Sequence, residues 1–160
     1  MSGKQKLYAR IHAQAAGLLS DESDPIANAA NLSALLFMEL DEVNWVGFYF
    51  LQGAELVLGP FQGQPACVRI GLGQGVCGTA AESRQTLIVD NVDEFAGHIA
   101  CDGASKAEIV IPLLKDGALL GVLDLDSPRL ARFDRFDQHG LEALADLYLA
   151  NSDSLLAIAT

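Results

Sequence analysis

A cysteine with polar neighbours stands in the second half of the chain, in the segment GHIACDGASKAEIVIP (residues 97–112). His98 precedes Cys101 by three residues, and Glu108 opens the strand-like run that follows. A cysteine that only fills a core usually has apolar neighbours, whereas a reactive thiol lies in polar, partly exposed surroundings. Three interpretations of Cys101 are therefore open: a core side chain, a metal ligand or a nucleophile.

Cys67 and Cys77 bring the number of cysteines to three. An odd number without an export signal argues against a structural disulfide framework, so we expect the resting thiols to be reduced. Cys77 falls in the first turn of an expected helix, and a helix N-terminus lowers the pKa of a thiol. A zinc site built from His98 and the cysteines lacks the close Cys-x-x-Cys spacing that would indicate one. The set is more typical of redox chemistry than of metal binding or core filling.

Three carboxylates are placed to converge on one face of a predicted hairpin. Asp124 and Asp126 are two residues apart on a strand, so both side chains point to the same face. Glu108 lies on the partner strand, across a turn at residues 115–117. Strand interiors disfavour Asp, and clustered carboxylates perturb one another's pKa. Two interpretations are open: a functional cluster, and a strand end that faces water.

Two aromatic side chains share a strand face with a glycine. Trp45 and Tyr49 flank Gly47 within residues 44–51, where side chains alternate between the faces. This pattern is typical of core packing around a small residue. It would also suit an aromatic wall, with Gly47 leaving room for a ligand.

The glycine-rich loop Gly73-x-Gly75-x-x-Gly78 matches the dinucleotide-binding fingerprint literally. Its context argues against a nucleotide, because two helices precede it and the later strands are joined by hairpins rather than by helical crossovers. Backbone N–H groups at the helix start, such as those of Gly75 and Val76, would still suit an anion, including a carboxylate. A tight turn that needs glycine only for its backbone is the alternative.

Hydrophobic spacing indicates the elements that must position these groups. Helical spacing extends over residues 4–19, from Pro25 to Leu40, and over residues 134–158. Asp24 is the expected N-cap of the second helix, and Pro25 suits its first position. We expect this helix to bury Ile26, Ala29, Ala30, Leu36, Phe37 and Leu40. Strands are predicted at residues 44–51, 56–61, 66–70 and 86–92, with a hairpin at 107–127.

This order of elements predicts the α+β class, an antiparallel β-sheet flanked by N- and C-terminal helices. The 160 residues contain no linker or repeat, so we expect a single domain over residues 1–160. A net charge of −11 with no block of Lys or Arg argues against binding to nucleic acid or to an anionic membrane. No apolar run is long enough to span a membrane and no signal-peptide core is present, so we expect a cytoplasmic protein.

Over essentially its full length the chain resembles the free methionine-(R)-sulfoxide reductases, which are built on the GAF domain fold. The resemblance is densest in the motifs NWVGFYFL, LVLGPFQGQPACVRI, GQGVCGTA, GHIACDGAS, EIVIPL and GVLDLDS. It implies reduction of the R epimer of free methionine sulfoxide by thiol chemistry, with no metal, flavin or nucleotide as cofactor. The three cysteines of the family fall on Cys67, Cys77 and Cys101. Its pocket residues fall on Trp45, Tyr49, Glu108, Asp124 and Asp126.

Sulfoxide reduction needs a thiol and an acid together, because the sulfur is a poor electrophile until its oxygen is protonated. We expect Cys101 to be the nucleophile that becomes a sulfenic acid, and Cys67 to resolve it as a disulfide. Cys77 is the alternative for either role. Thioredoxin would then reset the pair. Glu108 is the expected acid, because repulsion from Asp126 would raise its pKa.

Selectivity for the free amino acid also follows from charge. The α-ammonium group would meet Asp124 and Asp126, and the α-carboxylate would meet the N–H groups of Gly75 and Val76. The methyl group and the chain would rest on the two aromatic side chains described above. A peptide-bound methionine lacks both charges and would leave these groups unpaired, so it should be rejected.

Two positions depart from the family pattern: Gln74, where a basic residue is expected, and Ala107, where serine is expected. The change at Gln74 weakens an anion contact at the loop, and the role of His98 is open. The alternative function is a non-catalytic GAF-type sensor of a small molecule or of redox state, since a fold does not fix a function. The apolar N- and C-terminal helices would suit a homodimer interface.

Overall fold

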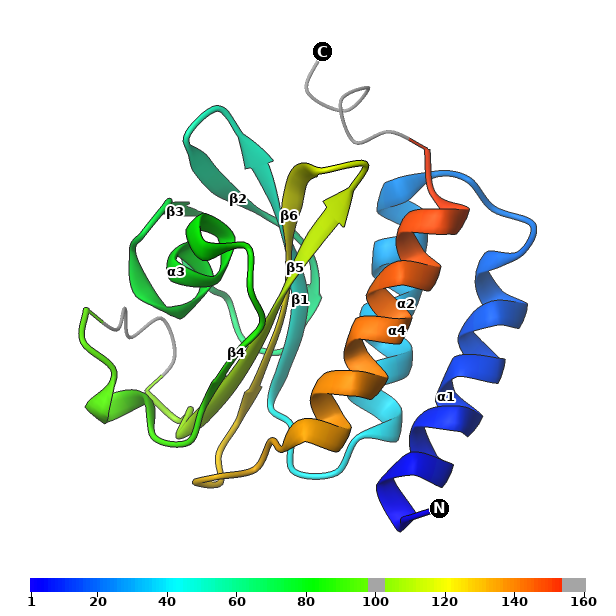
Figure 1. Cartoon of the computed structure of the whole chain (residues 1–160), viewed down its shortest axis with the longest axis horizontal. Helices are drawn as coiled ribbons and strands as arrows, with labels where there is room; N and C mark the ends of the chain where they lie inside the picture. The colour runs from blue at the N-terminus through cyan, green and yellow to red at the C-terminus, as the bar shows by residue number, and fades with distance from the viewer. Residues whose placement is uncertain (98–102, 154–160) are drawn as a thin grey trace.

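The computed structural model describes residues 1–97 and 103–153. Its elements, coloured along the chain in Figure 1, are α1 (Gly3–Leu19), α2 (Pro25–Glu39), β1 (Trp45–Gln52), β2 (Glu55–Gln62), β3 (Arg69–Gly71), α3 (Gly75–Ser83), β4 (Leu87–Val89), the 3-10 turn η1 (Val92–Glu94), β5 (Ala107–Lys115), β6 (Ala118–Ser127) and α4 (Arg135–Asn151). None of the helices in the described part of the chain is long and apolar enough to span a membrane.

The strands of the described residues form one antiparallel sheet in the order β3-β2-β1-β6-β5-β4. Two hairpins, β1–β2 and β5–β6, meet where β1 pairs with β6 at the centre. Asp116 and Gly117 both have positive φ, of 53° and 78°, as a tight two-residue hairpin turn requires. The α+β fold and the hairpin expected at residues 107–127 are confirmed.

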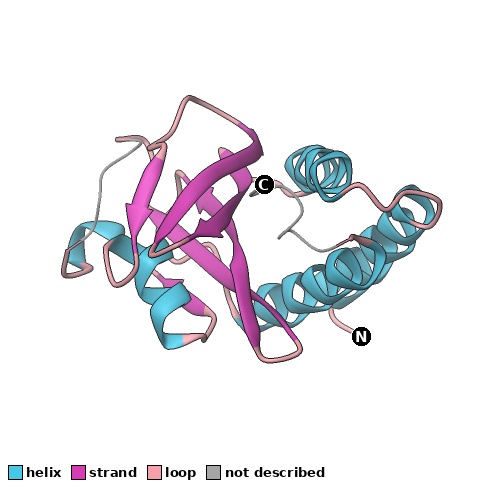
Figure 2. Cartoon of the chain, turned by 90° about the horizontal axis from the view of Figure 1, so that it is seen from above, coloured by secondary structure: helices cyan, strands magenta, loops and turns pink. Residues whose placement is uncertain are grey.

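Helices cover both faces of the sheet. Figures 1 and 2 show α3 on one side and the three long helices on the other. On that second side α2 and α4 pack on the strands, and α1 packs on α4 and α2. Because both faces are covered, β1 is buried on both: Val46 and Phe48 join the helical core, while Trp45 and Tyr49 join the core under α3. The alternation predicted from the sequence is confirmed.

Helix α2 begins where predicted but turns a different face inward. Asp24 caps it, because its carboxylate accepts hydrogen bonds from the backbone N–H groups of the second and third helical residues. Asn28 and Ser33 are buried, and the Asn28 amide donates to the hydroxyl of Ser152 at 3.1 Å. These polar anchors set the rotation of the helix. As a result Ala29, Leu36 and Leu40 are buried as expected, whereas Ile26, Ala30 and Phe37 are exposed.

Helix α4 ends at Asn151, so the expectation of a helix reaching residue 158 is wrong at residues 152 and 153 and otherwise lies outside the described residues. Ser152 adopts an extended backbone, and the N–H of Asp153 donates to the carbonyl of Ser23 at 2.8 Å. A backbone bond to another segment replaces the next helical bond, and the helix stops there.

Candidate active site

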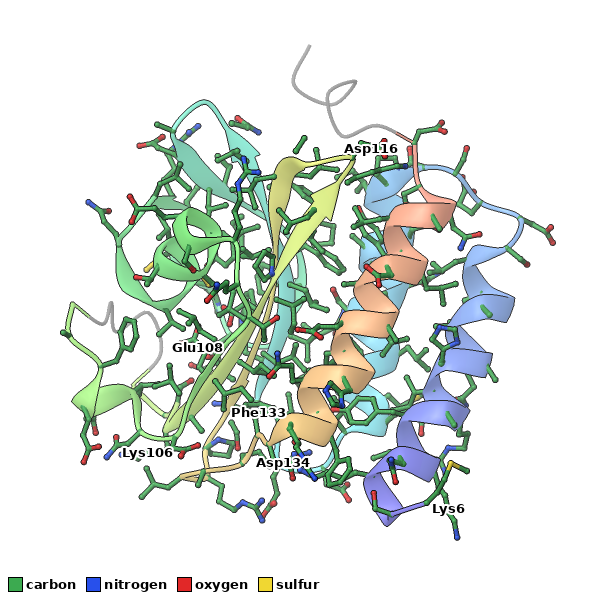
Figure 3. All side chains as sticks on the ribbon, viewed as in Figure 1. Lys6, Lys106, Glu108, Asp116, Phe133 and Asp134 are labelled. Carbon is green, nitrogen blue, oxygen red and sulfur yellow. The ribbon has the colours of Figure 1, made fainter. Side chains whose placement is uncertain are left out.

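A pocket lies between the sheet and α3, on the side away from the long helices. Its lining comes from β1, β5 and β6, from the start of α3 and from the segment before β3. Figure 3 labels Glu108 at this face of the sheet, beside α3. Eight of the residues singled out from the sequence line the pocket: Trp45, Tyr49, Gly75, Val76, Cys77, Glu108, Asp124 and Asp126.

The register of β5 and β6 brings the three carboxyl groups together. Glu108 is directly opposite Asp126, and Asp124 is two residues further along the same strand. Glu108 and Asp124 are only 7% and 5% exposed, and their side chains are hydrogen-bonded to each other. Cys77 reaches the same group from α3, and its thiol donates to Oε1 of Glu108 over 3.8 Å. The strand-end interpretation is therefore excluded for Glu108 and Asp124, because neither faces water.

Burial raises the pKa values of the two buried carboxyl groups. The pKa of Glu108 is raised well above its usual value, first by burial and then by the charge and hydrogen bond of Asp124. Burial and the nearby Asp126 raise the pKa of Asp124 in the same direction. The expected direction for Glu108 is right, but its expected cause is wrong: Asp124 acts on Glu108, and Asp126 acts on Asp124. Glu108 therefore keeps its proton to a higher pH than an exposed carboxyl group does.

The expectation of a low pKa for Cys77 is wrong. Its thiol is 4% exposed, and burial raises its pKa well above the usual value. The neighbouring carboxyl groups of Asp124 and Glu108 raise it further. Although Cys77 lies in the first turn of α3, desolvation and like charge outweigh the helix dipole.

The aromatic residues of β1 form one wall of the pocket. The ring centroids of Trp45 and Tyr49 are 6.0 Å apart, and Phe61 stacks on the other side of Trp45 at 5.3 Å. The indole N–H of Trp45 donates to the carbonyl of Gln64, which fixes the ring. Gly47 is required by this packing, since a Cβ atom there would lie 2.5 Å from the Trp45 ring. The small residue thus makes room for tryptophan rather than for a ligand.

The glycine loop gives α3 a start without a side-chain cap. Gly75 has a φ of 61°, which favours glycine, and a Cβ atom on Gly78 would lie 2.3 Å from the carbonyl oxygen of Gly71. Gln74 is the N-cap residue but makes no side-chain capping bond; its amide oxygen accepts from the N–H of Gly71. The side chain therefore leaves the first N–H groups of α3 uncapped at the pocket.

Two buried polar atoms at the pocket have no hydrogen-bond partner: Oγ of Ser105 and Oδ1 of Asp124. Ser105 is 7% exposed and was missed from the sequence. The sequence did contain a signal, because Ser105 lies between Cys101 and Glu108 within residues 97–112. An unpaired buried hydroxyl group is costly, so its place at the pocket suggests that a ligand completes it.

Cys67 and Cys77 differ in state. Cys67 is disulfide-bonded, whereas Cys77 is a free thiol. The hydroxyl of Tyr49 donates to the carbonyl of Cys67 at 2.9 Å, which joins the segment before β3 to the aromatic wall. The expected nucleophile Cys101 and its neighbour His98 lie outside the described residues.

Comparison with known proteins gives a consistent assignment. The GAF domain model matches residues 19–148. A free methionine-R-sulfoxide reductase of Escherichia coli is 48% identical over 141 residues, covering 88% of this chain and 86% of the relative. The chain belongs to this family of GAF-domain reductases. The resemblance inferred from the sequence motifs is therefore confirmed.

Two solved structures of the GAF fold are similarly close. The free methionine-R-sulfoxide reductase of Neisseria meningitidis in complex with its substrate is 44% identical, with a TM-score of 0.90 over 94% of this chain and 91% of the other. A protein of Burkholderia vietnamiensis, named as a proposed GAF sensor, is 57% identical, with a TM-score of 0.91 over 94% of this chain and 96% of the other.

Proposed function

We propose that this protein reduces free methionine-(R)-sulfoxide to methionine. The observation that carries the proposal is the buried carboxyl group of Glu108, whose pKa is raised, at a pocket walled by Trp45 and Tyr49. A sulfoxide needs a proton donor at oxygen and an apolar surface for its methyl group, and this pocket has both. The names of the relatives point to the same reaction.

The proposed reaction uses two thiols and no cofactor. The thiolate sulfur of Cys101 attacks the substrate sulfur while Glu108 protonates the sulfoxide oxygen. The hydroxyl group then passes from the substrate sulfur to the cysteine sulfur as the new S–S bond breaks, so methionine leaves and Cys101 becomes a sulfenic acid. The thiol of Cys67 then forms a disulfide with Cys101 and water departs. A dithiol of the thioredoxin type reduces that disulfide and is itself oxidised. The disulfide-bonded state of Cys67 and the free state of Cys77 support Cys67 over Cys77 as the resolving cysteine.

The substrate is proposed to bind through both of its charges. Its α-carboxylate lies at the uncapped start of α3, near the N–H groups of Gly75 and Val76. Its α-ammonium group meets Asp126 and the unpartnered Oδ1 of Asp124. A peptide-bound methionine sulfoxide brings neither charge, so it cannot make these contacts and should be rejected.

A coupled assay with thioredoxin and its reductase tests the proposal, in chelator-treated buffer, with three substrates side by side: free R-sulfoxide, free S-sulfoxide and peptide-bound R-sulfoxide. We expect turnover of the free R form alone. Cys101→Ser should abolish turnover, whereas Cys77→Ser should still form the disulfide and release one methionine per chain. Absence of turnover with all three substrates would contradict the proposal.

The alternative function is a non-catalytic sensor, and the name of the similar Burkholderia vietnamiensis structure supports it. A sensor binds its ligand without changing it, so conversion of the bound ligand by the wild-type protein separates the two functions. If calorimetry shows free methionine-R-sulfoxide bound by the wild-type protein but never converted, the sensor function replaces the reductase.

We also propose that the protein works in the cytoplasm, where thioredoxin keeps thiols reduced, and that it is a homodimer. A groove between α1 and α4, lined in part by His12, Phe136 and His139, supports an interface on this outer side. Light scattering after gel filtration should give twice the mass of 17.0 kDa.

A further inference from the structure

The cluster of Cys77, Glu108 and Asp124 has the composition of a metal site. One ligand atom from each residue, a sulfur and two carboxylate oxygens, lies within 4.8 Å of the others, and all three residues are buried. They come from α3, β5 and β6, so the fold and not a single loop holds them together. The proposed reaction uses Glu108 as an acid but gives the thiol of Cys77 no task.

A second observation also indicates a ligand here. Oδ1 of Asp124 and Oγ of Ser105 have no hydrogen-bond partner, although these residues are only 5% and 7% exposed. Both residues line the pocket, which gives a route from solvent to the cluster. The described lining residues include three acids and no Lys, Arg or His. Such a pocket attracts a cation, and the unpartnered oxygens are acceptors for it.

The spacing fits a small thiophilic cation. With Zn–S near 2.3 Å and Zn–O near 2.1 Å, tetrahedral ligand atoms lie about 3.4 to 3.6 Å apart. The thiol sulfur of Cys77 and Oε1 of Glu108 are 3.8 Å apart, so a shift of a few tenths of an ångström is enough for that pair. A thiolate ligand favours Zn²⁺ over Mg²⁺ and Ca²⁺, which prefer oxygen alone.

We propose that Cys77, Glu108 and Asp124 form an inhibitory binding site for Zn²⁺, separate from the redox pair Cys67 and Cys101. The ion takes Cys77 as thiolate and Glu108 and Asp124 as carboxylates, and the protons that these groups release go to solvent. Bound zinc occupies the carboxyl groups that substrate and proton transfer require, so it stops reduction until a chelator or a competing protein removes it. The inhibition rests on the proposed reductase function, whereas the binding does not.

Binding is tested on the reduced full-length chain carrying Cys67→Ser and Cys101→Ser, in which Cys77 is the remaining thiol. Cobalt(II) is the spectroscopic probe, and Zn²⁺ affinity is measured by competition with a chromophoric chelator. We expect one Co²⁺ per chain with a sulfur-to-cobalt charge-transfer band in the near ultraviolet, displaced by Zn²⁺ but not by Mg²⁺. Adding Cys77→Ser should remove the band and weaken Zn²⁺ binding by roughly 100-fold, since changes to outer-sphere groups alone cost 10- to 100-fold.

Two further variants on the same background serve as controls for the binding test. Asp124→Asn keeps the thiol, so it should retain the band while weakening Zn²⁺ binding. This variant replaces Cys77→Ser as the test if circular dichroism shows that Cys77→Ser does not fold. Asp93→Asn, at an exposed position of η1, should leave affinity unchanged. A cobalt spectrum without the sulfur band, or a Zn²⁺ affinity that Cys77→Ser does not change, overturns the proposal.

The wild-type assay completes the design. In metal-free buffer the reductase should turn over, and Zn²⁺ should inhibit it competitively with the sulfoxide until a chelator is added. Turnover without the cobalt band refutes only the zinc site. The cobalt band without turnover leaves the site standing and refutes the reductase function.

Discussion

At the floor of the pocket a thiol and two carboxyl groups share one buried surface. Cys77 stands at a helix start and Glu108 beside two other acids, and for both residues the largest influence on the pKa is burial. Residue types and spacing predicted that the carboxyl groups would meet, but not that Cys77 would join them. Burial depends on all the residues that pack around a group. The sequence next to Cys77 therefore could not show that the pKa of its thiol is raised rather than lowered.

Replacing the acid should separate chemistry from binding. Glu108→Gln keeps the size of the side chain but cannot give up a proton, so we expect kcat for free methionine-R-sulfoxide to fall about 10²- to 10⁴-fold. The KM should change much less, because the amide keeps the shape of the pocket. Steady-state kinetics measures both. A kcat close to that of the wild type would mean that another group is the acid.

The same variant tests the raised pKa. A carboxyl group with a raised folded-state pKa gives stability that is complete below its unfolded value of about 4.3 and is lost as pH rises through the folded-state pKa. The wild-type protein should therefore lose stability as pH rises above about 4.3, and Glu108→Gln should lose less. Urea unfolding at a series of pH values measures this. Parallel curves for the two proteins would refute the raised pKa.

Ser105 gives a test at the other polar atom without a partner. Ser105→Ala removes a buried hydroxyl group that bonds to nothing among the described residues, so thermal stability should be equal or higher. If that hydroxyl group bonds to substrate, KM should rise about 2- to 10-fold, as expected for one hydrogen bond. A lower melting temperature with an unchanged KM would instead indicate a purely structural role.

Among the elements, α3 depends on close packing against the loop before it. A Cβ atom on Gly78 would lie 2.3 Å from the carbonyl oxygen of Gly71, which is backbone and cannot rotate away. Gly78→Ala should therefore destabilise the protein by about 1 to 3 kcal/mol and lower activity, because α3 carries one side of the pocket. Urea denaturation and the reductase assay measure the two effects.

Gly17→Ala is the matched control within α1. A Cβ atom there meets nothing within 4 Å, so this change should stabilise the protein by about 0.5 to 1 kcal/mol. Equal effects of the two substitutions would show that the close approach at Gly78 is not what constrains α3.

Across the molecule, a buried charge network ties the first helix to the last. Asp137 is 1% exposed, and its carboxylate accepts from the hydroxyl of Tyr8, from Lys4 and from Arg132. Asp137→Ala leaves the buried Tyr8 hydroxyl without its partner and the buried Arg132 without a carboxylate, so we expect a loss of about 3 to 5 kcal/mol. The KM of the folded fraction should stay unchanged, because the pocket lies beyond the opposite face of the sheet. Calorimetry measures the loss of stability, and steady-state kinetics measures KM.

The fold followed from the sequence where the signal was local. A few adjacent residues determine each of three features: the cap at Asp24, the turn at Asp116 and the alternation along β1. The inward face of α2 was set instead by Asn28, whose partners include Ser152 at the other end of the chain. The end of α4 was set by a bond to Ser23. Such long-range partners have no local pattern.

The candidate site was likewise predicted only where its pattern is local. Alternation and register placed Asp124, Asp126 and Glu108 on one face, because both are properties of a single hairpin. Ser105 was missed because a lone serine in a loop has no period, and only the surrounding pocket gives its hydroxyl group meaning.

The central pairing of β1 with β6 also bears on how the protein folds. Trp45 and its partner Asp126 are about 80 residues apart, and closing so large a loop delays pairing. During synthesis β1 emerges long before β6, so it waits with an open edge and apolar residues on both sides. The nascent chain passes through an aggregation-prone interval that ends only when the strand bearing Asp124 and Asp126 arrives. The same strand that completes the sheet delivers two of the acids of the site, so a chain that has closed its sheet has also assembled this part of the pocket.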